Sequence, residues 1–151
     1  MNLAGLTLEH PIIQAPMAGV STPEMAAVAS DAGALGSIAV GAMDAAGARR
    51  MIEAVQARTA RPFNVNVFAH RPARPDPNRE RTWLAALAPL FAEFGASPPE
   101  RLTPIYRSFL EDPDLLRALV DLRPAVVSFH FGLPDAAQAA ARIWLQERGC
   151  P

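Results

Sequence analysis

His130 is the side chain best placed for chemistry, because it directly follows a short apolar run, residues 125–129. A run of this length predicts a buried strand, and parallel α/β proteins place their active sites at the carboxyl ends of strands. Strand alternation puts Ser128 and His130 on the same face. An imidazole at such an edge is suited to proton transfer near neutral pH. A structural histidine that binds a loop carbonyl is the alternative, and the residues leave both open.

Two other polar or flexible groups lie at comparable places. Asn64 and Asn66 share one face of another apolar run, residues 63–68, which is an unusual place for amides. If that face lines a site, the two amides can hydrogen-bond a heterocycle. At a solvent-exposed edge they would not indicate a binding site. Residues 16–19 (PMAG) follow the first apolar run, and small residues there allow close approach of the backbone to a flat ligand. An ordinary turn is the alternative.

The remaining candidates point to less chemistry. His10 precedes the first strand, so a structural role is expected, and His70 lies beside a proline-rich loop, which favours exposure to solvent. No cluster has metal-ligand spacing, so no metal is expected. The single cysteine, Cys150, lacks a neighbouring base and is expected to be inert. All 14 basic residues are arginine, which excludes a P-loop lysine or a Schiff-base lysine within these residues.

These side chains depend on strands and helices that alternate along the chain. Strands are expected over residues 11–15, 34–40, 63–68 and 125–129. Helices are expected from the Ser21/Thr22 cap to Gly33, from the Asp44 cap onward, and over residues 79–94, 99–110, 113–122 and 134–148. Residues 70–78 contain three prolines and predict a loop. Strand–helix–strand alternation is typical of a parallel sheet, so the fold class is α/β.

Composition and length narrow the class further. The chain has 151 residues, 50% of them hydrophobic and 19% charged, with a net charge of -1. This balance excludes a disordered chain and a basic nucleic-acid-binding surface. The first residues lack a secretory signal pattern and no apolar run approaches membrane-spanning length, so a cytoplasmic protein is expected. Four strand–helix units fit either an open four-stranded sheet or about half of an eight-stranded barrel.

Several segments resemble a known family, in register and in order. They are residues 14–24 (QAPMAGVSTPE), 33–37 (GALGS), 61–68 (RPFNVNVF) and 127–134 (VSFHFGLP). Together they resemble the nitronate monooxygenases, formerly called 2-nitropropane dioxygenases, over essentially the whole chain. The resemblance implies a TIM (β/α)8-barrel. Residues 1–151 would form its N-terminal half, about the first four βα units, with a helical insertion at about residues 70–112.

The resemblance also implies a reaction and a site. Family members use FMN and dioxygen to oxidise alkyl nitronates or nitroalkanes to a carbonyl compound and nitrite. Carried over by position, the backbone of Ala15, Pro16, Met17 and Ala18 would lie against the flavin ring. The Asn66 side chain would hydrogen-bond the flavin, and His130 would remove the α-proton of a neutral nitroalkane. The expected partners are these small molecules, with a homo-oligomer or a complementing second half also considered.

Three alternatives remain at this stage. Flavin-dependent enoyl-acyl carrier protein reductases share the opening motif but are less similar over residues 129–132 (FHFG). A non-catalytic truncated remnant is the second alternative, because the family binds the flavin phosphate on loops after its seventh and eighth strands. A flavodoxin-like binding module is the third, and the lack of a phosphate loop after the first strand disfavours it.

Overall fold

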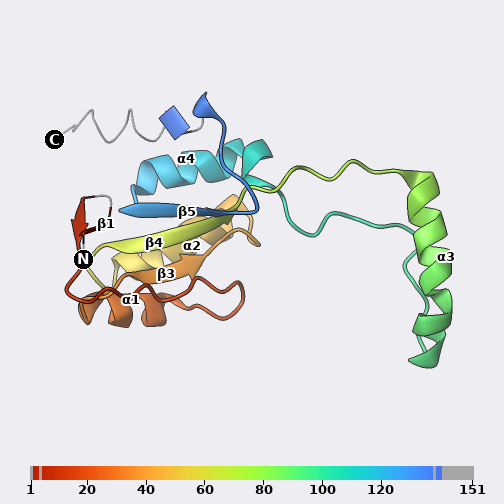
Figure 1. Cartoon of the computed structure of the whole chain (residues 1–151), viewed down its shortest axis with the longest axis horizontal. Coiled ribbons are helices and arrows are strands. Elements are labelled where there is room, and N and C mark those ends of the chain that lie inside the picture. Colours follow the sequence, from red (N-terminus) through yellow and green to blue (C-terminus); the bar gives the residue numbers. More distant parts are fainter. Residues whose placement is uncertain (1, 4, 138, 141–151) are drawn as a thin grey trace. The chain divides into compact units, whose positions relative to one another are not determined.

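A parallel sheet carries the side chains that the sequence singles out. The computed structural model contains β3 (Gly36–Ala39), β4 (Phe63–Phe68) and β5 (Val126–His130) in that order. Figure 1 shows β4 between its two parallel neighbours. Spatial neighbours are therefore successive in sequence, as in a parallel barrel, whereas a doubly wound sheet reverses its order. The three expected strands are confirmed, and this order disfavours the flavodoxin-like alternative.

The structure describes residues 2–3, 5–137 and 139–140. They divide into two compact units, of which the smaller is Ala73–Ile105 and the larger is built from the described residues on either side of it. The last predicted helix, residues 134–148, falls mostly outside the described residues, which show helical backbone at 136–137 and 139–140. Among the described residues, no helix combines the length and the apolar character needed to cross a membrane.

The prediction of a buried first strand at residues 11–15 is wrong in two respects. Only one bridge forms, between Ile13 and Leu35, and the side chains of Ile12 and Ile13 are 59% and 47% exposed. Prolines at both ends of the segment, Pro11 and Pro16, remove amide donors and prevent a longer ladder. The segment nevertheless runs parallel to β3 at its free edge. A short antiparallel pair that the sequence did not predict, β1 (Asn2–Leu3) and β2 (Leu6–Thr7), precedes it.

Three capped helices cover one face of the sheet. They are α1 (Pro23–Asp31), α2 (Ala45–Gln56) and α4 (Pro113–Leu122), and the side chains that cap them are Thr22, Asp44 and Asp112. Each cap accepts a hydrogen bond from a backbone N–H of the first turn, which satisfies an otherwise unpaired donor. Because α1 packs on α2 and α2 packs on α4, these three helices lie side by side on the same face. This arrangement confirms the predicted helices near these positions.

The two faces of the sheet differ in polarity. Ile38, Val65 and Val67 are fully buried in a hydrophobic cluster with side chains of α1, α2 and α4. Strand alternation sends the residues between them to the opposite face, where Asn64 and Asn66 lie. Both asparagines are nonetheless buried, at 3% and 1% exposure. The sheet therefore has an apolar face that fixes the helices and a polar face available for a site.

The smaller unit contains α3 (Pro77–Glu93), close to the predicted helix at 79–94. The helix predicted over residues 99–110 is wrong. This stretch is irregular apart from a single 3₁₀ turn, Phe109–Glu111, which belongs to the larger unit. Pro98, Pro99 and Pro104 disfavour helical conformation in the residues before them and cannot donate helical hydrogen bonds. Leucines and aromatics in the stretch suggested a helix, but proline spacing decides the outcome.

Gly36 marks the closest approach between α1 and the sheet. A Cβ atom at Gly36 would lie 1.9 Å from the carbonyl oxygen of Ala26 and 2.6 Å from its carbonyl carbon. We therefore expect Gly36→Ala to lower the free energy of unfolding by about 3 kcal/mol, as overpacking against fixed backbone does. Urea unfolding measures the loss.

Gly47→Ala in α2 is the matched control, because its Cβ would meet side-chain atoms only, the nearest being the Asp44 Oδ1 atom, 3.0 Å away. That change should alter the free energy by about 1 kcal/mol or less. Equal unfolding midpoints for Gly36→Ala and the unmutated protein would show that the helix does not lie this close to β3.

Candidate active site

Asn66 and His130 meet at the carboxyl edge of the sheet. Asn66 lies in β4 and His130 ends β5, and the Oδ1 atom of Asn66 is 3.0 Å from the Nδ1 atom of His130. Asn66 is 1% exposed, whereas His130 is exposed. The strand register, which pairs Asn66 with Ser128, brings these side chains from adjacent strands onto one face. A buried amide thus holds one nitrogen of an accessible imidazole.

Ser128 holds the other end of the Asn66 amide. The Nδ2 atom of Asn66 donates to the Ser128 carbonyl oxygen at 3.2 Å and to the Ser128 Oγ atom at 3.0 Å. Both polar atoms of the amide are therefore engaged within the protein. Because an amide nitrogen carries two hydrogens, these two acceptors match its full donor capacity.

The loop that follows the first extended segment is held by two side chains, Gln14 and Ser21. The Ser21 Oγ atom accepts from the Met17 backbone N–H at 2.8 Å and from Gln14 Nε2 at 3.1 Å. It donates to the Ala15 carbonyl oxygen at 3.0 Å. Ser21 is buried, so these bonds do not compete with water. The backbone of residues 15–18 is consequently fixed, although Ala15, Met17 and Ala18 are exposed.

Gln14 also ties this loop to the sheet. Its Oε1 atom accepts from the Ser37 backbone N–H at 2.8 Å, and the Ser37 Oγ atom accepts from Asn64 Nδ2 at 3.2 Å. Asn64 therefore belongs to a network that runs from the loop through β3 to β4. Its Oδ1 atom is buried and has no hydrogen-bond partner among the described residues. Asn64 and Asn66 look equivalent in sequence, but Asn64 bonds Ser37 of β3, whereas Asn66 bonds Ser128 and His130 of β5.

Aromatic rings flank the exposed side of His130. Phe131 stacks edge-on against Phe68 with ring centroids 5.1 Å apart, and Tyr106 packs against Phe68 at 5.7 Å. Phe131 has a φ of 69°, a left-handed conformation that costs about 1–3 kcal/mol in a residue other than glycine. It is also 74% exposed. Strained backbone and an exposed ring next to the imidazole are features found at binding sites.

The structure places the six predicted site residues in two groups. Asn66 and His130 are in direct contact, and Ala15, Pro16, Met17 and Ala18 form the clamped loop. The described residues show no hydrogen bond between the two groups, which are linked through the sheet. Sequence reasoning missed Gln14, Ser21 and Ser128. The available signal was a polar residue within or next to an apolar run, where a buried side chain needs a partner.

Among the described residues, no hydrogen bond joins the side chain of His10 or His70 to Asn66 or His130, and His70 is half-buried. His10 is exposed and precedes α1, and the His70 carbonyl oxygen accepts from Ser108 Oγ at 2.6 Å. Among the described residues, no three His, Cys, Asp or Glu side chains are grouped to bind a metal. Cys150 lies outside the described residues.

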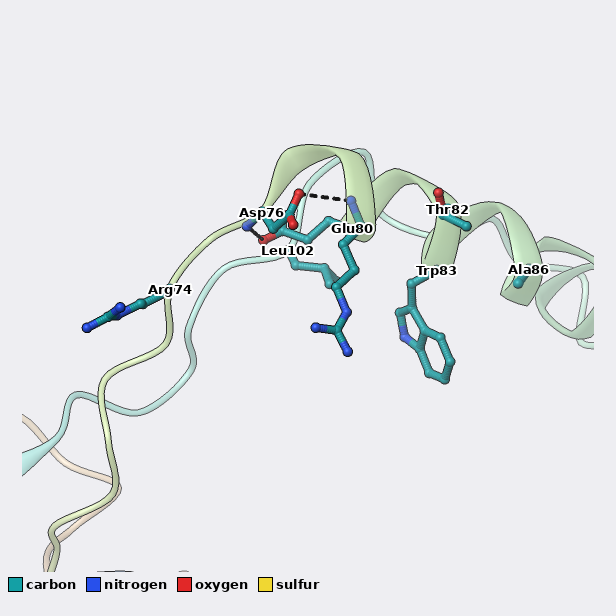
Figure 2. A pocket seen from close by; sticks show the side chains of 8 residues that line it. Arg74, Asp76, Glu80, Thr82, Trp83, Ala86 and Leu102 are labelled. Atoms are coloured by element: carbon teal, nitrogen blue, oxygen red, sulfur yellow. Dashed lines mark hydrogen bonds between the residues drawn. The ribbon is translucent and has the colours of Figure 1, made fainter.

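The smaller unit has a pocket of its own. It has a volume of about 640 Å³ and is lined partly by residues of α3, including Trp83. Figure 2 shows two hydrogen bonds at the start of α3. The Asp76 backbone N–H donates to the Glu80 carboxylate, and the Asp76 carboxylate accepts from the Arg79 backbone N–H. The acidic side chains are thus engaged in capping, and two arginines, Arg74 and Arg79, supply the opposite charge. None of the predicted site residues lines this pocket.

Successive parallel strands with a polar pair at their carboxyl ends define a protein of the TIM-barrel class, and comparison supports this. The structure superposes on that of a nitroalkane oxidase from Streptomyces ansochromogenes with a TM-score of 0.76 and 33% identity. The match covers 93% of this chain and 39% of that one.

Sequence comparison gives the family. The profile of the nitronate monooxygenase family matches residues 2–144. A nitronate monooxygenase of Pseudomonas aeruginosa PAO1 is 59% identical over 136 residues, which are 90% of this chain and 39% of the relative. One from Paraburkholderia phytofirmans is 56% identical over 131 residues, 87% of this chain and 36% of the relative. The chain belongs to the nitronate monooxygenase family and spans less than two-fifths of the length of these relatives.

Removal of the Ser21 hydroxyl tests the loop clamp. Ser21→Ala eliminates one donor and two acceptor contacts in a buried position, so we expect the free energy of unfolding to fall by about 1–3 kcal/mol. Amide hydrogen exchange at Met17 should become faster, because its N–H loses its acceptor.

Thr22→Ser is the matched control, since it keeps the neighbouring hydroxyl that caps α1. It should leave exchange at Met17 unchanged. If Ser21→Ala also leaves this exchange unchanged, the hydroxyl does not hold the loop.

Proposed function

We propose that the full-length protein oxidises alkyl nitronates, and neutral nitroalkanes after their deprotonation, with FMN and dioxygen, yielding a carbonyl compound and nitrite. Membership of the nitronate monooxygenase family carries this proposal. The Asn66–His130 pair at the carboxyl edge of the sheet supports it, because barrel enzymes place their chemistry at this edge. A cytoplasmic location fits the same proposal.

The residues present fit the ring portion of a flavin. The loop over residues 15–18 exposes small side chains and backbone, and the Ser21 clamp holds it in one conformation. A rigid, shallow surface of this kind can support a flat ring system, and Asn66 Nδ2 would donate to it in exchange for its contact with Ser128 Oγ. We assign Ala15, Pro16, Met17, Ala18 and Asn66 to this role. FMN would supply the electron acceptor that the side chains of the chain do not provide.

His130 would act on neutral nitroalkanes. Its free ring nitrogen takes the proton from the carbon that bears the nitro group, and the electron pair of the broken C–H bond forms a C=N bond. An N=O electron pair moves onto oxygen, which gives the nitronate, and the imidazole becomes protonated. Phe131 and Phe68, beside the imidazole, offer an apolar surface for the alkyl group. A substrate supplied as the nitronate does not need this step.

Oxygen uptake tests the overall reaction. The full-length protein should be yellow as purified or after addition of FMN, and it should consume oxygen and release nitrite when ethyl nitronate is added. An oxygen electrode measures the dioxygen consumed, and a colorimetric assay measures the nitrite formed in the same reaction. A protein that binds FMN yet consumes no oxygen with any short-chain nitronate contradicts the proposal, as does one that binds no flavin.

If His130 removes the α-proton, its replacement should lower kcat/KM much more for a neutral nitroalkane than for the corresponding nitronate. In His130→Gln, kcat/KM for neutral nitroethane should fall by about 100-fold or more, as expected when a general base is removed. The value for ethyl nitronate should fall by about tenfold at most, because the proton is already absent.

His70→Gln changes a second histidine near the end of the neighbouring strand and should leave both values near those of the unmutated protein. If His130→Gln lowers kcat/KM for both substrates by the same factor, the imidazole has a role other than proton removal.

A further inference from the structure

We propose that Asn66 is a positioning residue that holds neutral His130 as its Nδ1–H tautomer, with Ser128 orienting the Asn66 amide. The inference concerns the hydrogen-bond network itself. Its consequence for turnover rests on the proposed function, but the network can be tested without flavin or substrate.

The orientation of the Asn66 amide follows from its contact with backbone. A carbonyl oxygen can only accept hydrogen bonds, so the amide atom 3.2 Å from the Ser128 carbonyl must be the nitrogen. The Ser128 Oγ atom, 3.0 Å from the same nitrogen, can accept as well. The opposite orientation would place two acceptor-only oxygens against each other in a site where Asn66 is 1% exposed. Burial keeps water from relieving that conflict.

The tautomer of His130 follows from the amide orientation. With Nδ2 directed at Ser128, the atom 3.0 Å from His130 Nδ1 is the Asn66 Oδ1, which can only accept. The Nδ1 atom must therefore carry the hydrogen. In the neutral imidazole the proton is then absent from Nε2, whose lone pair is free to accept. Among the described residues, no hydrogen bond occupies Nε2.

This arrangement gives the proton acceptor of the proposed reaction the correct form before substrate arrives. The other tautomer would present an N–H from Nε2 and could not take a proton there. A histidine that takes a proton commonly depends on a second group that fixes its tautomer. Here that group is a neutral amide on the adjacent strand, itself fixed by main chain, so the strand register determines the tautomer.

Nitrogen-15 NMR of the full-length protein with labelled histidine measures the tautomer directly. Spectra are recorded at alkaline pH, chosen to favour neutral histidine side chains in general, and the resonances absent from His130→Gln identify His130. We expect Nδ1 to be the protonated nitrogen in the unmutated protein. An unmutated protein in which Nε2 carries the hydrogen overturns the inference without the need for any variant of Asn66.

Variants of Asn66 then show that the amide is the cause. Asn66→Leu should shift His130 to a mixture with substantial Nε2–H form. Asn64→Leu is the matched control, because Asn64 lies two residues earlier on the same face and bonds Ser37 instead. It should leave the tautomer unchanged. An Nδ1–H form that persists fully in Asn66→Leu contradicts the role of Asn66.

The kinetic consequence separates this inference from the proposed function. In Asn66→Leu reconstituted with FMN, kcat/KM for nitroethane should fall at least tenfold further than that for ethyl nitronate. One outcome is that the tautomer changes as expected while kcat/KM falls equally for the two substrates. That result supports the hydrogen-bond network and contradicts proton removal by His130. If the tautomer does not change, the network fails, whatever the activity.

Discussion

A buried amide must make its hydrogen bonds inside the protein, and the polar face of this sheet is organised by that constraint. Asn66 is almost fully buried on the face of the sheet opposite the hydrophobic cluster of Ile38, Val65 and Val67. Leaving its two polar atoms unpaired would cost about 1–3 kcal/mol each. The register of β4 against β5 answers this need, because it brings Ser128 to one end of the amide and His130 to the other. The apolar face enforces that register, since a one-residue slip would expose Val65 and Val67.

The same principle connects the loop over residues 15–18 to the sheet. Gln14 and Ser21 satisfy backbone groups of that loop, and Gln14 reaches β3 through Ser37. Both halves of the candidate site are therefore fixed by side chains that themselves need partners. A site built this way is set in position before any ligand binds, which lowers the cost of ordering on binding. Phe131, strained and exposed at the end of β5, is the part of the edge least explained by packing.

Sequence patterns predicted most of the framework because apolar runs and helix caps are local signals. The strand over Phe63–Phe68 and the helix over Pro113–Leu122 follow from apolar pattern, proline and capping residues within a few positions. The first strand and the helix at 99–110 were predicted wrongly where prolines override an apolar pattern. His130 and Asn66 could be identified from strand ends and alternation. Their contact could not, because it joins residues 64 positions apart and depends on the register between β4 and β5. The partners Ser128 and Ser21 were hidden for the same reason, since a serine shows its role only when its acceptors are known.

We propose that the flavin and the substrate meet at the edge formed by residues 15–18, Asn66 and His130. A crystal structure of the full-length protein with FMN and a bound nitronate or unreactive nitroalkane analogue tests it most directly. We expect the flavin ring in van der Waals contact with the backbone of residues 15–18, and Asn66 Nδ2 within about 3.2 Å of a flavin acceptor. We also expect the Nε2 atom of His130 to face the carbon that bears the nitro group. A flavin ring bound away from this loop, or a substrate carbon out of reach of His130, would contradict the account.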